Sequence, residues 1–290
     1  MKGPLPFGCG QCLPCRISRR RLWTHRLLLE QSMHENSCFV TLTYRLPSYG
    51  GLTHDSLTLD PKHTQDWLKR LRKFTSLKLR YYLVGEYGEN TQRPHYHAAL
   101  FGLPWGPNTS DILGKTWGLG HTHVGDLTKD SAAYIAGYVT KKMTSPTDPR
   151  LKGRYPEFAR MSLRPGIGAL SIPVLEEAMT TDLGCNLIIN TGDVPKELQY
   201  GKSKMPLGRY LTKKLRSYLG FPSSDSPPEI LDQWRLQMQE LLEANVDIAT
   251  LPKNPSFRRE AIQIILVELS KQRVLNMETR NKIHSKKGTL

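Results

Sequence analysis

The order of apolar patterns between residues 38 and 143 constrains the fold more than any other feature of the sequence. Residues 38–44 are dense in β-branched and aromatic side chains, which predicts a β-strand. Side chains alternate between the two faces of a strand, so Phe39, Thr41 and Thr43 share one face and Val40, Leu42 and Tyr44 share the other.

A helix and two further strands are predicted in the same segment. Asp60 followed by Pro61 is typical of a helix start, with an N-cap and a proline at the first helical position. Apolar residues then recur at helical spacing: Trp67, Leu68, Leu71 and Phe74. Residues 79–86 and 95–103 are predicted strands of a hairpin whose loop begins at Tyr87, and residues 121–125 suit an edge strand.

This order of strand, helix, strand, strand and helix indicates an α+β fold. We expect an antiparallel sheet with helices packed on one face, which leaves the other face open for a site. The sequence further divides into four parts: residues 1–35 with a cysteine cluster and a basic helix from Arg16, a core over 36–145, a Pro- and Gly-rich extension over 146–228, and a helical tail over 229–290.

The charge of the chain favours a polyanionic partner. Forty-one Lys and Arg residues stand against 26 Asp and Glu, a formal charge of +15, and bound phosphates release condensed counterions. No run approaches the roughly 18 apolar residues of a membrane span, and the N-terminus lacks the apolar core of a signal peptide. We therefore expect a soluble, intracellular protein that binds nucleic acid and does not bind a membrane.

Two histidines on the second strand of the hairpin are candidate metal ligands. His95 and His97 are two residues apart, so both imidazoles project from the same face of the strand. Glu86 ends the preceding strand, and the hairpin brings its carboxylate alongside them. Two imidazoles and one carboxylate leave open positions on Mg²⁺ or Mn²⁺ for phosphate oxygens, as metal-assisted phosphoryl transfer requires.

Other residues compete for these roles. Glu89 in the hairpin loop is the alternative carboxylate. His121 and His123 repeat the two-residue spacing, but no carboxylate lies near them in the sequence. A His-x-His pair alone is also compatible with packed or surface histidines.

The predicted helix over residues 131–143 carries two tyrosines. Its apolar face consists of Ala132, Ile135, Ala136, Val139 and Met143. Tyr134 and Tyr138 lie roughly 135° away on the helical wheel, so we expect them to point away from the surface that packs on the sheet. With Lys141 and Lys142 they place two hydroxyls beside cations that suit a phosphate. A stacking platform for nucleic acid without catalysis remains an alternative.

The cysteines suit a metal better than a disulfide framework. Three of the five crowd into Cys9, Cys12 and Cys15, which predicts a structural Zn²⁺ site with His25 or Cys38 as the fourth ligand. A set of thiols without metal remains open.

Three segments in order carry a resemblance to a known superfamily: residues 39–44, the Pro94-His95-Tyr96-His97 motif, and Tyr134 to Lys141. They resemble the motifs of rolling-circle replication initiators of the HUH endonuclease superfamily, which have a ferredoxin- or RRM-like sheet. The chain is most similar to replication initiation proteins of microviruses, particularly gokushoviruses, and the similarity extends to residues 9–16, 164–168 and, weakly, 206–210.

The resemblance implies a function and roles for particular residues. Tyr138 and Lys141 match the Tyr-x-x-Lys signature, and Tyr134 is the additional tyrosine of the two-tyrosine class. Some relatives resemble Tyr-x-x-Lys-Tyr, and here Gly137 replaces that lysine. The implied activity is nicking and rejoining of single-stranded origin DNA of a small phage genome through a 5′-phosphotyrosine. The host replication helicase and polymerase are implied partners, and the cytoplasm of the bacterial host is the implied location.

Two other classes of function fit the same residues. A single-strand-binding or packaging protein would share the fold and the basic surface and perform no chemistry. A metal-dependent hydrolase would use the histidine pair with water in place of tyrosine. A covalent protein–DNA adduct distinguishes the initiator from both.

Overall fold

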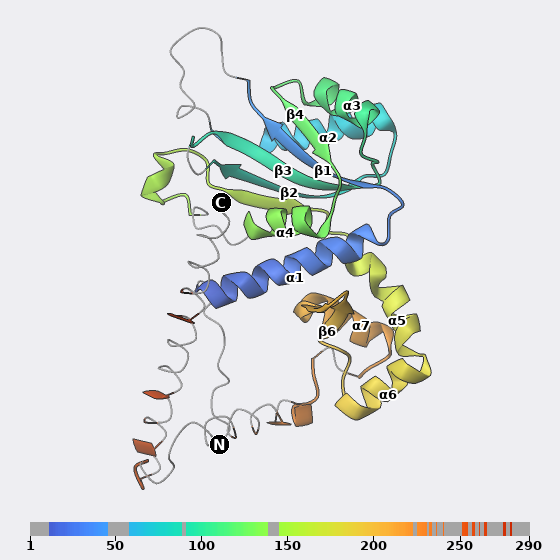
Figure 1. Ribbon diagram of the computed structural model, residues 1–290, viewed down its shortest axis with the longest axis vertical. Helices are drawn as coiled ribbons and strands as arrows, with labels where there is room; N and C mark the ends of the chain where they lie inside the picture. Colours follow the sequence, from blue (N-terminus) through green and yellow to red (C-terminus); the bar gives the residue numbers. More distant parts are fainter. Residues whose placement is uncertain are drawn as a thin grey trace.

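The computed structural model describes residues 12–45, 58–88, 91–138 and 145–222, with isolated residues beyond them (Figure 1). Two short 3₁₀ turns, Pro149–Leu151 and Ala169–Ser171, accompany the helices and strands. The main elements are α1 (Leu13–Gln31), β1 (Ser37–Thr43), α2 (Pro61–Thr75), β2 (Arg80–Tyr87), β3 (Pro94–Phe101), α3 (Pro107–Trp117), β4 (Thr122–Gly125), α4 (Lys129–Tyr138), β5 (Phe158–Met161), α5 (Ile172–Met179), α6 (Asp182–Thr191), β6 (Glu197–Tyr200), β7 (Ser203–Pro206) and α7 (Gly208–Tyr218).

The centre of the fold is a five-stranded sheet in the order β4-β1-β3-β2-β5, in which all neighbours are antiparallel. The α+β class, the hairpin of β2 and β3, and the edge strand β4 are confirmed. The fifth strand, β5, comes from the segment over 146–228 that was predicted to be an extension. The sheet therefore extends beyond the predicted core boundary at residue 145.

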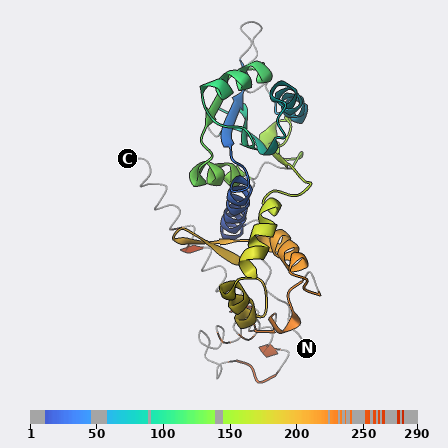
Figure 2. The ribbon, with the colours of Figure 1, turned by 90° about the vertical axis from the view of Figure 1, so that its right-hand side faces the viewer.

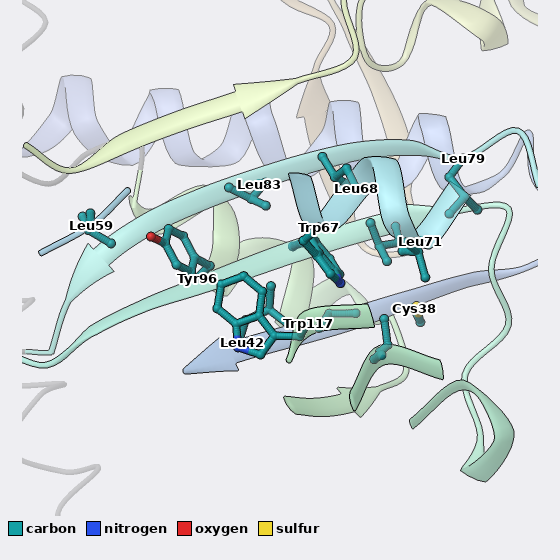
Figure 3. Close-up of a cluster of buried hydrophobic side chains, with 14 of the residues drawn as sticks. Cys38, Leu42, Leu59, Trp67, Leu68, Leu71, Leu79, Leu83, Tyr96 and Trp117 are labelled. Carbon is teal, nitrogen blue, oxygen red and sulfur yellow. The ribbon is translucent and has the colours of Figure 1, made fainter. Parts of the chain in front are cut away.

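One face of the sheet is covered by α2 and α3. Asp60 caps α2 as predicted, because its carboxylate accepts a hydrogen bond of 2.7 Å from the Lys62 amide. Figure 3 shows Trp67 of α2 and Trp117 of α3 among the side chains of the strands. Phe74 was expected in this core but is 57 % exposed, because it lies in the last turn of α2. The core comprises, among others, Cys38, Val40, Leu42, Leu68, Leu71, Leu83, Tyr96, Ala98, Leu100 and Leu113.

The opposite face is covered by α1 and α4, so the prediction of helices on one face alone is wrong. Every strand residue from Tyr96 to Phe101 is buried, which happens only when both faces are covered. α1 begins at Leu13 rather than Arg16, with Pro14 in its first turn. Its side chains and those of α4 form this second core: Leu27, Leu28, Tyr82, Val84, Ala99, Phe101, Ala132, Ile135 and Ala136.

A second group of elements, α5, α6, α7 and the β6–β7 hairpin, packs on the other side of α1. Figures 1 and 2 show α1 between this group and the sheet. Its core includes Ile172, Val194, Leu207, Leu211 and Leu215, with Leu29 of α1 against it. The helical tail predicted over 229–290 lies largely outside the described residues. No helix in the described part of the chain is long and apolar enough to span a membrane.

Candidate metal and tyrosine site

The register of the sheet brings the three predicted metal ligands together. Glu86 pairs directly with His95 across the β2–β3 hairpin, and His97 follows two residues later on the same face. The ligand atoms of the three residues all lie within 4.8 Å of one another, and among the described residues no other group of this kind is found. This face is the one that α1 and α4 cover, so the site lies between the sheet and a helix.

The two imidazoles direct the same nitrogen at one carboxylate oxygen. His95 Nε2 lies 2.6 Å from Glu86 Oε1, and His97 Nε2 lies 3.3 Å from the same oxygen. Glu86 and His97 are buried, whereas His95 is half-buried. Three ligand atoms with one more accessible side are the arrangement that suits a catalytic ion, which needs open coordination positions.

The hydrogen bond behind His95 fixes its tautomer. His95 Nδ1 lies 3.0 Å from the Arg93 carbonyl oxygen, which can only accept, so Nδ1 carries a proton. In the neutral ring, Nε2 then presents a lone pair to the Glu86 carboxylate. Two lone pairs at 2.6 Å repel each other unless a proton or a metal ion lies between them. The donor set therefore fits a divalent cation, and its chemistry does not identify which cation.

Thr41 plays the corresponding part for His97. Its hydroxyl lies 2.9 Å from His97 Nδ1, and Thr41 pairs with His97 in the register of β1 and β3. Groups that hold the second nitrogen of a ligating histidine fix the ring orientation. The alternation of the strand placed Thr41 on the correct face, but no role for this residue was predicted. The available signal was its membership of the first motif.

Both tyrosines of α4 contact the ligand His97. The Tyr138 ring is stacked on the His97 ring at a centroid distance of 5.4 Å, and the Tyr134 ring meets it edge-on at 5.1 Å. The two tyrosine rings lie 4.9 Å apart. The expectation that they point away from the sheet is wrong, because α4 crosses the sheet where Phe39 and His97 rise from it and meet the tyrosines.

The surroundings of Tyr138 raise the pKa of its phenol far above the ordinary value. Burial is the main cause, and hydrogen bonds to Tyr134 and Glu86, together with the charge of Glu86, add to it. Tyr138 is half-buried, whereas Tyr134 is 47 % exposed. The phenol of Tyr138 is therefore protonated when Glu86 carries its charge and no cation offsets it.

Several candidate residues lie elsewhere or outside the described residues. Glu89 and Lys141 are outside them, as are Lys142, Val139 and Met143 of the predicted helix. His121 and His123 are exposed at the edge strand β4 and do not join the metal-ligand group. The predicted site is thus described for its three metal ligands and its two tyrosines.

The cysteine cluster is described in part. Cys12 and Cys15 bring their sulfurs to 3.3 Å at the start of α1, and Cys9 lies outside the described residues. His25 is ten residues along α1 from Cys15, about 15 Å along the axis, and its Nδ1 bonds to the Pro206 carbonyl at 2.9 Å. Cys38 is buried in the sheet core, where burial raises the pKa of its thiol to about 12. Neither can complete a zinc site with Cys12 and Cys15, so zinc binding stays a prediction without a fourth ligand.

Comparisons with known proteins agree with the motifs. Residues 37–143 match the sequence model of a family of replication-associated proteins named after ORF2. The chain is 33 % identical over 184 residues to Replication-associated protein ORF2 of Spiroplasma virus 4, covering 55 % of each chain. It is 33 % identical over 159 residues to Replication-associated protein VP4 of Bdellovibrio phage phiMH2K, covering 49 % of this chain and 50 % of the relative.

A third relative is Replication-associated protein ORF4 of Chlamydia phage 1, with 29 % identity over 160 residues, 47 % of this chain and 38 % of the relative. The chain thus spans about half the length of the first two relatives and less of the third. No solved structure matches. These similarities confirm the resemblance to replication proteins of gokushovirus-like microviruses.

Proposed function

We propose that this protein is a replication initiator that nicks and rejoins single-stranded DNA at the origin of a small phage genome. The observation that carries the proposal is the position of Tyr134 and Tyr138, whose rings lie against His97 beside the Glu86, His95 and His97 group. Nucleophile and metal-ligand candidates come from separate motifs, and their contact is what a phosphoryl transfer to tyrosine requires.

Glu86, His95 and His97 would hold the cation, Mg²⁺ or Mn²⁺. When bound, a divalent ion supplies positive charge that polarises the scissile phosphate and offsets the charge of Glu86. The protein holds the three ligand groups ready, because the Arg93 carbonyl and the Thr41 hydroxyl fix the two imidazoles.

Tyr138 is the proposed nucleophile of the first cleavage. Its hydroxyl donates to the Glu86 carboxylate, which therefore stands ready to receive the phenolic proton. The bond between the tyrosine oxygen and phosphorus forms as the bond from phosphorus to the 3′ oxygen breaks. The products are a 5′-phosphotyrosine and a 3′ hydroxyl, and attack of a 3′ hydroxyl on the phosphotyrosine rejoins the strand.

Tyr134 is the proposed nucleophile for the second cleavage. An initiator that is still bonded to one 5′ end needs another nucleophile to cut the regenerated origin. Tyr134 and Tyr138 are one helical turn apart with rings in edge-on contact at 4.9 Å. Either hydroxyl can therefore reach the same phosphate after a small shift.

The test is cleavage of a labelled single-stranded origin library with Mn²⁺, resolved on denaturing gels, with mass spectrometric mapping of phosphotyrosine. We expect H95A and H97A to abolish cleavage while binding persists, because binding rests on many phosphate contacts. Y138F should lose most first cleavage. Y134F should form one adduct and fail to join circles.

Three results would contradict parts of the proposal. Adducts on neither tyrosine would leave a single-strand-binding protein or a water-using hydrolase, according to whether the DNA is cut. Nicking by the H95A/H97A double variant in EDTA at the wild-type rate would reject the metal site. Full joining by Y134F would reduce the enzyme to a nickase with one tyrosine.

The proposed role also carries partners and a location. Replication from a nicked origin needs strand separation and synthesis, so the host helicase and polymerase are the proposed partners in the cytoplasm of the bacterial host. Co-purification of the tagged protein with host replication proteins from infected cells tests this part separately from the chemistry.

A further inference from the structure

We propose that a basic strip beside the tyrosine pair binds the backbone of the single-stranded DNA that enters the site. The strip consists of Arg20 and Arg21 of α1, Lys129 of α4, and Tyr200 and Lys204 of the β6–β7 hairpin. It rests on the proposed function, and it adds a surface that lies outside all the sequence motifs. Contacts between three elements build it.

The first contact joins α1 to the tyrosine helix. Arg20 Nε donates a hydrogen bond of 2.9 Å to the carbonyl oxygen of Ala133, the residue before Tyr134. The bond engages Nε, and a guanidinium carries four further N–H donors that suit phosphate oxygens. Arg20 is exposed, so a DNA phosphate can reach it.

Gly137 makes room for this arginine. A side-chain carbon at Gly137 would lie 3.6 Å from Arg20 Nε, so any longer side chain would meet the guanidinium. The position that carries a lysine in some relatives is therefore occupied here by a cation from another helix. Arg20 supplies the positive charge that the local sequence around Tyr134 lacks.

The second contact joins α1 to the hairpin. Arg21 Nη2 donates to the carbonyl oxygen of Lys204 at 2.5 Å, and His25 Nδ1 bonds to the carbonyl of Pro206 at 2.9 Å. Two bonds one helical turn apart along α1 thus hold β7 against the helix. The side chain of Lys204 is exposed beside Arg21, which brings a second pair of cations to the surface.

The third contact joins the hairpin to α4. Lys129 Nζ lies 5.5 Å from the centroid of the Tyr200 ring, and this ring is 41 % exposed. Lys129 precedes Tyr134 by five residues, about 7.5 Å along the helix axis. The strip therefore offers two exposed aromatic rings, Tyr200 and Tyr134, with cations between them.

Cations interleaved with exposed rings fit single-stranded rather than duplex DNA, because only unpaired bases offer their faces for stacking. The acidic residues on the same elements are Glu30, Asp130 and Glu197. Glu30 is buried and paired with Arg80, and Glu197 lies at the far end of β6 from the hairpin tip. Positive charge thus prevails on this surface of α1 and the hairpin.

The test measures binding of a fluorescein-labelled oligothymidylate by anisotropy over a range of salt concentrations. Each of R20Q, R21Q and K204Q should weaken binding several-fold and lower the salt slope by about 0.7, the value for one phosphate contact of a single strand. Y200A should weaken binding roughly five-fold or more, and Y200F should not. K69Q and K73Q on α2, which covers the other face of the sheet, are matched controls and should bind as wild type.

R20K separates charge from structure. Lysine keeps the charge, so R20K should retain the wild-type salt slope. An R20K slope as low as that of R20Q would overturn the phosphate role, since the arginine would then act only through its bond to Ala133. Unchanged affinity and slope in R20Q, R21Q and K204Q together would overturn the strip.

The failure of this inference is distinguishable from the failure of the proposed function. Strip variants should raise the DNA concentration needed for half-maximal cleavage and leave single-turnover cleavage at saturating DNA unchanged. Weakened binding by the strip variants with no phosphotyrosine in the wild type would support the strip and reject the initiator. Adducts in the wild type with unaffected binding in the strip variants would do the reverse.

Discussion

Replacement of Thr41 by valine tests whether the group behind His97 prepares the metal site. Valine keeps the shape and the strand preference of threonine and removes only the hydroxyl, which lies 2.9 Å from His97 Nδ1. Without this contact the ring loses its hydrogen-bonded anchor. We expect T41V to lower the affinity for Mn²⁺ while the protein stays folded.

The contacts of His97 set the expected magnitude. Loss of a group that orients a metal ligand typically costs 10- to 100-fold in affinity, about 1.4 to 2.7 kcal/mol. The ring of His97 is also stacked on Phe39 at 5.6 Å and on Tyr138 at 5.4 Å, and both contacts persist in T41V. Because these rings still restrict the imidazole, the loss should lie near the lower limit, about 10-fold.

Calorimetric titration with Mn²⁺ measures the effect, and T43V is the matched control. Thr43 lies on the same strand face, and its hydroxyl donates to the His121 carbonyl at 3.3 Å. T43V should therefore bind Mn²⁺ within about two-fold of wild type, well inside the smallest loss expected for an orienting group. An unchanged affinity in T41V, or an equal loss in T43V, would refute the orienting role.

Three further predictions concern stability. L42A should destabilise the protein by about 2 to 5 kcal/mol in urea unfolding, because Leu42 is fully buried between the sheet and α2 and α3. D193A should cost about 3 to 5 kcal/mol in the same assay, since it removes the carboxylate that pairs with the buried guanidinium of Arg216. D60A should cost about 1 kcal/mol through the lost cap of α2, and D60N should largely restore it.

The parts of the fold that local patterns govern could be predicted from the sequence. The alternation of residues 38–44 matches β1, in which Cys38, Val40 and Leu42 are buried. The hairpin was predictable because a short loop forces its strands to pair, and this pairing places Glu86 opposite His95. A side-chain period of two residues then puts His97 on the same face.

The second layer of helices depended on a signal of another kind. Ala98 to Phe101 are four consecutive apolar residues on β3, and all of them are buried. A run of this kind indicates a strand covered on both faces, whereas alternation indicates one exposed face. The strand was predicted from its composition, and the absence of alternation was given no weight. Contacts between distant segments, such as β5 on β2, had no local signal.

The position of the tyrosines shows why a helical wheel cannot place a site. The wheel gives the angle between Tyr134 and the apolar stripe of α4, but the line along which α4 crosses the sheet decides what lies under each angle. Ala132 and Ala136 let the helix approach α1 and the sheet closely, so side chains beside the stripe also reach the strands. There His97 meets both tyrosine rings. The contact that buries Tyr138 raises its pKa and brings its hydroxyl to Glu86, so the departure from the wheel is what joins the nucleophile to the metal ligands.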